Sequence, residues 1–258
     1  MAGLICNDKC SRYFAYHILE EELNIRLSIS LNNLQKDVDC CETSQGTHSN
    51  DSLGFGKSLS EIKLCKLSVC DTKELLLHPP YILHQLSQHL LQHLDTEGLF
   101  RKRGLTRRIN ILKDKLEQGV ELSDENPHDV ANLFTLFLRQ LPQHLFPASF
   151  NPILLQVLHS MQEANQIKMV QCLCWLLPRH HFETLLYVVH FFQSVAQHSN
   201  NNRMSLDGLA TILAPNIVQF EMTAKNYRII TETQTHFVHL LLLHALDFVQ
   251  LPTMSTEV

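Results

Sequence analysis

The sequence has little of what breaks helices or crosses membranes. It contains 8 glycines and 9 prolines among 258 residues, which disfavours a turn-rich β fold and favours long helices. No apolar run approaches the roughly 20 residues that a membrane-spanning helix needs, and the densest run, at residues 185–192, contains His190. We therefore expect a soluble, all-α protein without an integral membrane segment.

An excess of positive charge is also absent. The chain has 21 Lys and Arg against 26 Asp and Glu, a formal net charge of -5, so no overall field draws it to nucleic acid or to an anionic membrane. The N-terminus lacks the basic region and apolar core of a signal peptide, and none of the eight cysteines forms a C-x-x-C pair. These absences predict a cytoplasmic protein with reduced thiols and without a metal site.

Changes in composition divide the chain into four segments. Residues 1–34 carry aromatic and apolar residues at mostly helical spacings and predict a helical leader. Residues 35–57 lose most apolar side chains and are rich in Ser, Thr, Asn and Gly, which is typical of a flexible linker. Residues 58–250 form the main domain, which begins with an extended lead-in to about residue 77, and residues 251–258 are a short tail.

Helical periodicity in the main domain is clear from Pro79-Pro80 onward. Gly119 is placed to end one helix, Pro142 ends another, and the last helix is expected at about residues 233–249. The apolar stripes that we expect to be buried are Ile82, Leu83, Leu86, Leu90, Leu91 and Leu94; Leu105, Ile109, Leu112 and Leu116; and, after a helix start at Asp129, Val130, Leu133, Phe134, Phe137, Leu138 and Leu141.

Three short motifs follow one another in this domain. Residues 96–104 read TEGLFRKRG, so Arg101 follows two apolar residues that can pin the loop and lies between two glycines that permit a tight turn. Residues 138–142 read LRQLP. Residues 202–204 read NRM and are followed at 209–216 by LATILAPN. An arginine held on such a turn is suited to entering a phosphate site of a partner, because its planar guanidinium stays charged and donates paired hydrogen bonds.

In this order and at these separations, the three motifs resemble the Rho GTPase-activating (RhoGAP) domain family, whose patterns read roughly EGxFR, LRxLP and NxM…LAxxxxPN. The resemblance covers about residues 60–250. It implies a single multi-helix bundle that activates a Rho-family small GTPase in the GTP-bound state. Such a protein is an activator without an active site or cofactor of its own, and the absence of a glycine-rich phosphate loop agrees with this.

The resemblance also implies roles for particular residues. Arg101 would be the catalytic arginine finger inserted into the partner, and Arg139 would hydrogen-bond the loop that carries it. Asn216 would offer its amide to the partner or to the finger. Lys102 and Arg139 would also contact the partner. Alternatives remain for two of them: Arg139 could cap the end of its helix, and Asn216, just beyond a helix stopped by Pro215, could form an Asx turn. A nucleic-acid patch at Lys102, Arg103, Arg107 and Arg108 is disfavoured, because no aromatic residues are interleaved.

The sequence departs from the family pattern at three positions. Thr135 stands four residues before Arg139, where the family usually has a partner-facing lysine, and we expect it off the buried stripe of its helix. His144 replaces the second proline of the usual LPEPL, and Arg103 replaces a small residue. These changes leave an alternative function, a catalytically weak or inactive module that binds a GTPase as a scaffold. A helical adaptor unrelated to GTPases would require all three motifs to be accidental.

The 16 histidines are a further feature of the composition. His89 and His93 have the i, i+4 spacing of a two-ligand metal face, but no third ligand is near them in the sequence. We interpret them as polar residues on a helix surface. The same interpretation applies to His180, His181, His236, His239 and His244.

Overall fold

The computed structural model of the chain describes residues 9–23, 54–68 and 76–245. Its elements are, in chain order, α1 (Lys9–Leu23), β1 (Leu67–Ser68), β2 (Leu76–Leu77), α3 (Tyr81–Leu91), α4 (Thr106–Glu117), α5 (Pro127–Gln140), the 3-10 helix η1 (Ala148–Phe150), α6 (Asn151–Ser160), α7 (Glu163–Trp175), α8 (Arg179–Gln197), α9 (Ser199–Asn202), α10 (Leu206–Ile217) and α11 (Tyr227–Leu243). The two short strands pair antiparallel in the lead-in to α3. The all-α prediction is confirmed, apart from this minimal pairing.

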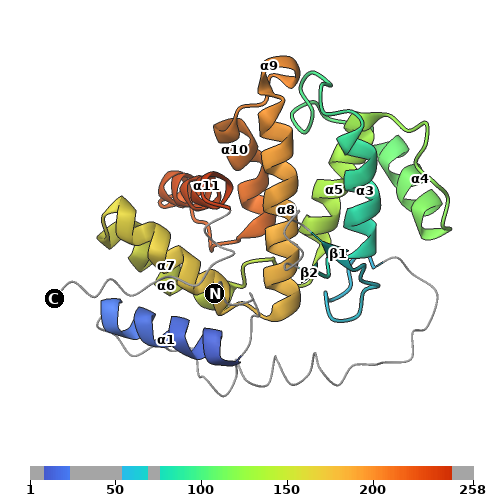
Figure 1. The fold of residues 1–258 in the computed structure, drawn as a ribbon. Helices are drawn as coiled ribbons and strands as arrows, with labels where there is room; N and C mark the ends of the chain where they lie inside the picture. The colour runs from blue at the N-terminus through green and yellow to red at the C-terminus, as the bar shows by residue number, and fades with distance from the viewer. Residues whose placement is uncertain (1–8, 24–53, 69–75, 246–258) are drawn as a thin grey trace.

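The helices are arranged around α8, which stands at the centre of Figure 1. Helices α3 and α5 lie on one side of α8, with α4 outermost, and α10 and α11 lie on the other side (Figure 1). Helices α6 and α7 pack together at one end of the bundle, and α1 lies against α7. The loop between α3 and α4, which carries Arg101, therefore lies at the end of the bundle away from α1 (Figure 1).

Local sequence signals explain several helix boundaries. The α5 helix begins with Pro127, whose missing amide costs nothing in a first turn, and the side chain of Asn126 caps it by accepting from His128 N at 2.9 Å. Ser205 caps α10 by accepting from Gly208 N at 3.2 Å. Gly119 follows the end of α4 with a φ of 77°, a left-handed conformation that glycine adopts without strain.

Aromatic side chains fill the centre of the core. Phe134 of α5 stacks on Phe191 of α8 with ring centroids 5.1 Å apart, and Trp175 packs against Phe182 at 5.2 Å. Burial of each such side chain contributes roughly 1.5–3 kcal/mol to stability. The largest fully buried side chains include Trp175, Phe134, Phe137, Phe146, Phe182, Phe192 and Phe237.

The leader helix is part of this packing. Ala15, Ile18 and Leu19 of α1 are buried, and the Arg12 guanidinium donates to the carbonyl of Leu176 at 2.9 Å. A surface ion pair between Lys168 and Glu22 (2.9 Å) joins the same two helices. The prediction of a leader helix is confirmed for residues 9–23. Residues 24–53, which include most of the expected linker, lie outside the described residues.

Some expectations about boundaries and exposure were wrong. Leu91 is 39% exposed and Leu105 is 61% exposed, although both belong to apolar stripes that were expected to be buried. The last helix begins at Tyr227, before the expected residue 233, and ends at Leu243, before the expected residue 249. His89 and His181 are buried rather than on the surface. One ring nitrogen of each hydrogen-bonds a backbone carbonyl, His89 with Glu125 at 3.1 Å and His181 with Leu145 at 3.1 Å, which offsets the cost of burying a polar ring. No described helix is long and apolar enough to span a membrane.

We expect the fold to lose stability in mild acid. Burial lowers the pKa of several histidines below the usual 6.5, so below that pH the unfolded chain binds more protons than the folded one, and stability falls as the pH falls. Each contributes at most about 1.4 kcal/mol per pH unit, and less where water screens it. The melting temperature should therefore be lower at pH 5.5 than at pH 7.5, and an unchanged or higher value would contradict this. The histidines concerned are His84, His89, His128, His180, His190 and His236.

Candidate functional site

The loop between α3 and α4 presents Arg101 on a fixed base. Leu99 is fully buried, and the ring of Phe100 packs between α5 and α8, with its centroid 6.1 Å from that of Phe134 and 4.6 Å from that of Phe192. Arg101, the next residue, is exposed. The expectation that two apolar residues pin this loop is confirmed. We call residues 98–104 the finger loop.

The backbone of the finger loop has two left-handed residues. Gly98 has a φ of 73°, and its carbonyl accepts from the amides of Arg101 and Lys102, both at 2.9 Å. Phe100 has a φ of 68°, which is unusual for a bulky side chain and costs of order 1–3 kcal/mol. The aromatic contacts of Phe100 hold this conformation, so the turn is shaped by core packing rather than by glycine alone.

Asn202, which lies about a hundred residues later in the chain, fixes the segment that leads into the finger loop. This fully buried side chain donates to the carbonyls of Leu94 (2.9 Å) and Val195 (2.8 Å) and accepts from the amide of Met204 (2.8 Å). The backbone carbonyl of Asn202 accepts from Gly98 N at 2.7 Å. The third motif thus holds the first, a role that the sequence did not indicate because the two motifs are remote in the chain.

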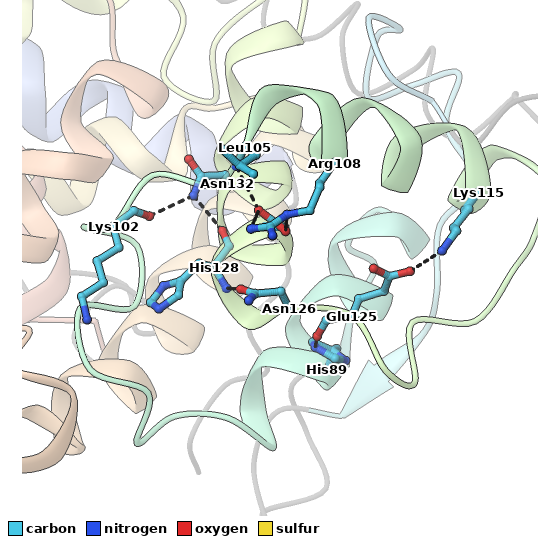
Figure 2. Close-up of polar contacts among 10 residues, drawn as sticks. His89, Lys102, Leu105, Arg108, Lys115, Glu125, Asn126, His128 and Asn132 are labelled. Carbon is cyan, nitrogen blue, oxygen red and sulfur yellow. Dashed lines mark hydrogen bonds and ion pairs between the residues drawn. The ribbon is translucent and has the colours of Figure 1, made fainter.

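Asp129 fixes the exit from the finger loop. The carboxylate is buried in the first turn of α5, accepts from Leu105 N at 3.2 Å and pairs with Arg108 Nε at 2.6 Å (Figure 2). A side chain in place of Gly104 would collide with this carboxylate. The sequence placed Asp129 at the start of α5, whereas the helix begins at Pro127 and Asp129 turns inward.

The backbone carbonyl of Lys102 is hydrogen-bonded to α5, while its side-chain ammonium remains accessible to solvent. Asn132 of α5 donates to the Lys102 carbonyl at 3.1 Å and to the His128 carbonyl at 2.7 Å (Figure 2). The Lys102 ammonium is half-exposed and lies 3.6 Å from Glu97. Burial, followed by the charge of Lys102, lowers the pKa of His128 beneath the loop. The loop can therefore present Arg101 and Lys102 together on one ordered turn.

Arg139 and Asn216 meet each other rather than the finger loop. Arg139 Nε donates to Asn216 Oδ1 at 3.2 Å, and no hydrogen bond joins Arg139 to the loop in the described residues, contrary to expectation. Asn216 is buried in the last turn of α10, and its amide donates to the Ile212 carbonyl at 2.8 Å. Asn216 is therefore not in a loop beyond a helix stop, because Pro215 lies inside α10.

Thr135 is buried, which corrects the expectation that it lies off the buried stripe. It is 9% exposed, and its hydroxyl donates to the Asn132 carbonyl of its own helix at 3.0 Å. The position faces inward because α5 packs against α3, α4 and α10, so that its buried arc is wider than a single stripe. At the position where the family usually has a lysine, this chain therefore has an uncharged side chain whose hydroxyl is already hydrogen-bonded within its own helix.

We expect Asn216→Ala to destabilise the domain. The substitution leaves Arg139 Nε and the Ile212 carbonyl without their partner, and the lost bonds should lower the free energy of unfolding by about 1–3 kcal/mol. Urea unfolding measures this effect, with Asn110→Ala on the exposed face of α4 as the control, expected within about 0.5 kcal/mol of the parent chain. Equal stability of both variants would show that the internal bonds of Asn216 contribute nothing.

No group of three or more His, Cys, Asp or Glu side chains in the described residues is placed to hold a metal ion. What the site offers chemically is positive charge: Arg101, Lys102, Arg103, Arg107 and Arg108 are all exposed. Arg108 pairs with Asp129 and Lys102 lies near Glu97, whereas no ion pair joins Arg101, Arg103 or Arg107 to another of the described residues. Such a surface is suited to an acidic or phosphate-bearing partner.

Comparison with known proteins identifies the fold and the family. The family model of the RhoGAP domain matches residues 80–221. Human Rho GTPase-activating protein 11A is 33% identical over 186 residues, which are 70% of this chain and 18% of that protein, and mouse Rho GTPase-activating protein 6 is 30% identical over 184 residues, 61% of this chain and 18% of that protein. This chain thus spans less than a fifth of the length of these two relatives.

Solved structures agree in fold. The crystal structure of human Rho GTPase activating protein 15 superposes with a TM-score of 0.65 at 21% identity, covering 87% of this chain and 99% of that one. The BH domain of GRAF, the GTPase regulator associated with focal adhesion kinase, superposes with a TM-score of 0.60 at 17% identity, covering 67% and 97%. Because the family model matches more than half of the chain, this protein belongs to the RhoGAP domain family.

Proposed function

We propose that this protein is a GTPase-activating protein that binds a Rho-family small GTPase in the GTP-bound state and inserts Arg101 into its nucleotide site. The observation that carries the proposal is the exposed guanidinium of Arg101 on a loop fixed before and after it, by Phe100 and by the backbone of Lys102. Membership of the RhoGAP family supports the choice of partner.

The proposed chemistry takes place in the partner. The GTPase holds its own nucleotide and magnesium, and its hydrolysis is slow because negative charge on the phosphate oxygens lacks a counter-charge in the transition state. An arginine supplied in trans neutralises that charge and is worth roughly 10³ to 10⁵ in rate. A loop that is already ordered loses less conformational freedom on insertion, which lowers the barrier further.

The surrounding residues take supporting roles in this proposal. Lys102 and the cations of the finger loop attract the acidic partner and speed its association. Arg139 is exposed and would meet the partner directly. The Asn216 side chain is buried, so it would act through Arg139. Its Oδ1 accepts a hydrogen bond from Arg139 Nε at 3.2 Å.

A non-catalytic scaffold is the second candidate, and Thr135 favours it. The usual lysine would offer an ammonium to the partner, and the loss of one charged hydrogen bond at an interface costs about 1.5–3 kcal/mol. Thr135 supplies no charge, and its hydroxyl is already used within α5. This candidate predicts binding to the GTP-loaded partner without faster hydrolysis.

Single-turnover GTP hydrolysis separates these candidates. Purified Rho, Rac and Cdc42 proteins are loaded with GTP, and phosphate release is followed with increasing amounts of this chain, while binding is measured with a non-hydrolysable GTP analogue. We expect at least one of the three GTPases to be accelerated with a saturable dependence on concentration. Binding without acceleration would support the scaffold, and neither binding nor acceleration would contradict both candidates.

A further inference from the structure

The finger loop is held before and after Arg101 by the surrounding helices. Before Arg101, helices α5 and α8 pack around the ring of Phe100, and the carbonyl of Asn202 in α9 accepts from Gly98 N. After Arg101, the Lys102 amide donates to the Gly98 carbonyl within the loop at 2.9 Å. The next peptide, between Lys102 and Arg103, is bonded to α5 through Asn132 (Figure 2).

The amide of Asn132 is well placed to orient that peptide. Its two N–H groups are both used, one on the Lys102 carbonyl at 3.1 Å and one on the His128 carbonyl at 2.7 Å. The second bond lies within α5, four residues back, and fixes the direction of the amide. A donor oriented in this way by its own helix can hold the loop without a further contact.

Arg139, the residue that the family resemblance assigned to holding the loop, is engaged elsewhere, with Asn216. The loop is nevertheless bonded to α5, through Asn132 about two helical turns before Arg139. We propose that Asn132 is a positioning residue of the finger loop, which orders the peptide between Lys102 and Arg103 by its hydrogen bond to the Lys102 carbonyl. This inference rests on the proposed function for its effect on hydrolysis, but not for its effect on the order of the loop.

Loss of this bond should change the rate more than the affinity. Without this bond the peptide between Lys102 and Arg103 is freer to move, so the adjacent Arg101 guanidinium samples more positions, and only a fraction of them place it on the transition state. One hydrogen bond of this kind corresponds to about a tenfold change in an equilibrium or rate. We therefore expect Asn132→Ala to lower the maximal stimulated rate about tenfold, with the half-saturating concentration of the chain unchanged.

The order of the loop can be measured without a GTPase. Trypsin cleaves after Arg101, Lys102 and Arg103, which follow one another in the loop, and cleavage requires a mobile backbone. Mass spectrometry of limited digests should show faster cleavage at these bonds in Asn132→Ala by about tenfold. Asn110→Ala, at an exposed position of α4, is the matched control and should leave cleavage unchanged.

Two further variants test the chemistry of the bond. Asn132→Gln keeps both amide N–H groups and should recover part of the loop protection and of the maximal rate. Asn132→Asp keeps the size of the side chain but cannot donate when ionised, so it should behave like Asn132→Ala. Recovery by Gln and not by Asp is the pattern expected of a donor, and equal behaviour of Gln and Asp would overturn the proposal.

The outcomes also separate this inference from the proposed function. Unchanged cleavage at residues 101–103 in Asn132→Ala overturns the inference whether or not the chain activates a GTPase. A uniform rise in cleavage together with a lower melting temperature would show a general structural role and overturn it as well. If the parent chain accelerates no GTPase but Asn132→Ala selectively exposes the loop, the proposed function fails and the positioning of the loop by Asn132 stands.

Discussion

Replacing Arg101 with alanine should abolish most of the stimulated GTP hydrolysis, by a factor of about 10³ or more. The guanidinium interacts most strongly with charge that exists only in the transition state, so its loss should lower the maximal rate far more than the affinity. Single-turnover hydrolysis and binding to a non-hydrolysable GTP complex measure the two quantities separately. Arg101→Lys should recover little, because an ammonium lacks the planar fork of the guanidinium.

Arg107→Ala is the matched control for Arg101→Ala. Arg107 is also an exposed arginine close to the finger loop, so its loss removes the same charge from the same surface. We expect Arg107→Ala to change mainly the association rate and its dependence on salt. If both variants lost binding and rate in the same proportion, Arg101 would be one contributor to an electrostatic surface rather than a finger.

The second large effect should come from Asn202→Ala. The variant leaves the carbonyls of Leu94 and Val195 and the amide of Met204 without their buried partner, and each such loss costs about 1–3 kcal/mol. We expect the free energy of unfolding to fall by about 3–5 kcal/mol in urea titrations. This exceeds the effect expected for most single substitutions.

Asn201 provides the control for Asn202, since it has the same side chain one position earlier in α9 but is exposed. Asn201→Ala should stay within about 0.5 kcal/mol of the parent chain. A small effect of Asn202→Ala, comparable with that of Asn201→Ala, would mean that other groups or water replace the three hydrogen bonds. The finger loop would then be held mainly by Phe100.

The helices and the order of the motifs could be predicted from the sequence, because both depend on local patterns. The stripe of Leu105, Ile109, Leu112 and Leu116 and the glycine after it predicted α4 and its end. Its last three members are buried, whereas Leu105 precedes the helix and is exposed. The finger loop was found in the same way, from two apolar residues before Arg101. Where only one face of a helix packs against a neighbour, the spacing of apolar residues is sufficient to predict which residues are buried.

The errors occurred where burial depends on partners that are distant in sequence. Thr135 was expected outside the stripe of α5, but three helices pack around α5 and bury it. Pro215 suggested a helix end, yet α10 continues to Ile217, whose carbonyl accepts from Phe146 N at 2.9 Å. We did not predict the roles of Asn202, Asp129 and Asn132 for the same reason. Each forms a hydrogen bond with a segment that is distant in the sequence, and no local pattern indicates such a pairing.

The bond between Asn202 and Leu94 spans 108 positions of the chain. During synthesis the segment around Arg101 leaves the ribosome well before the asparagine that closes its base, and at about 5–20 residues per second this interval lasts several seconds. Contacts between such remote segments form late in folding, because the intervening chain must first be ordered. The nascent protein therefore cannot present a rigid arginine until the α9 segment has been made, and competence to act on a partner is tied to completion of the bundle.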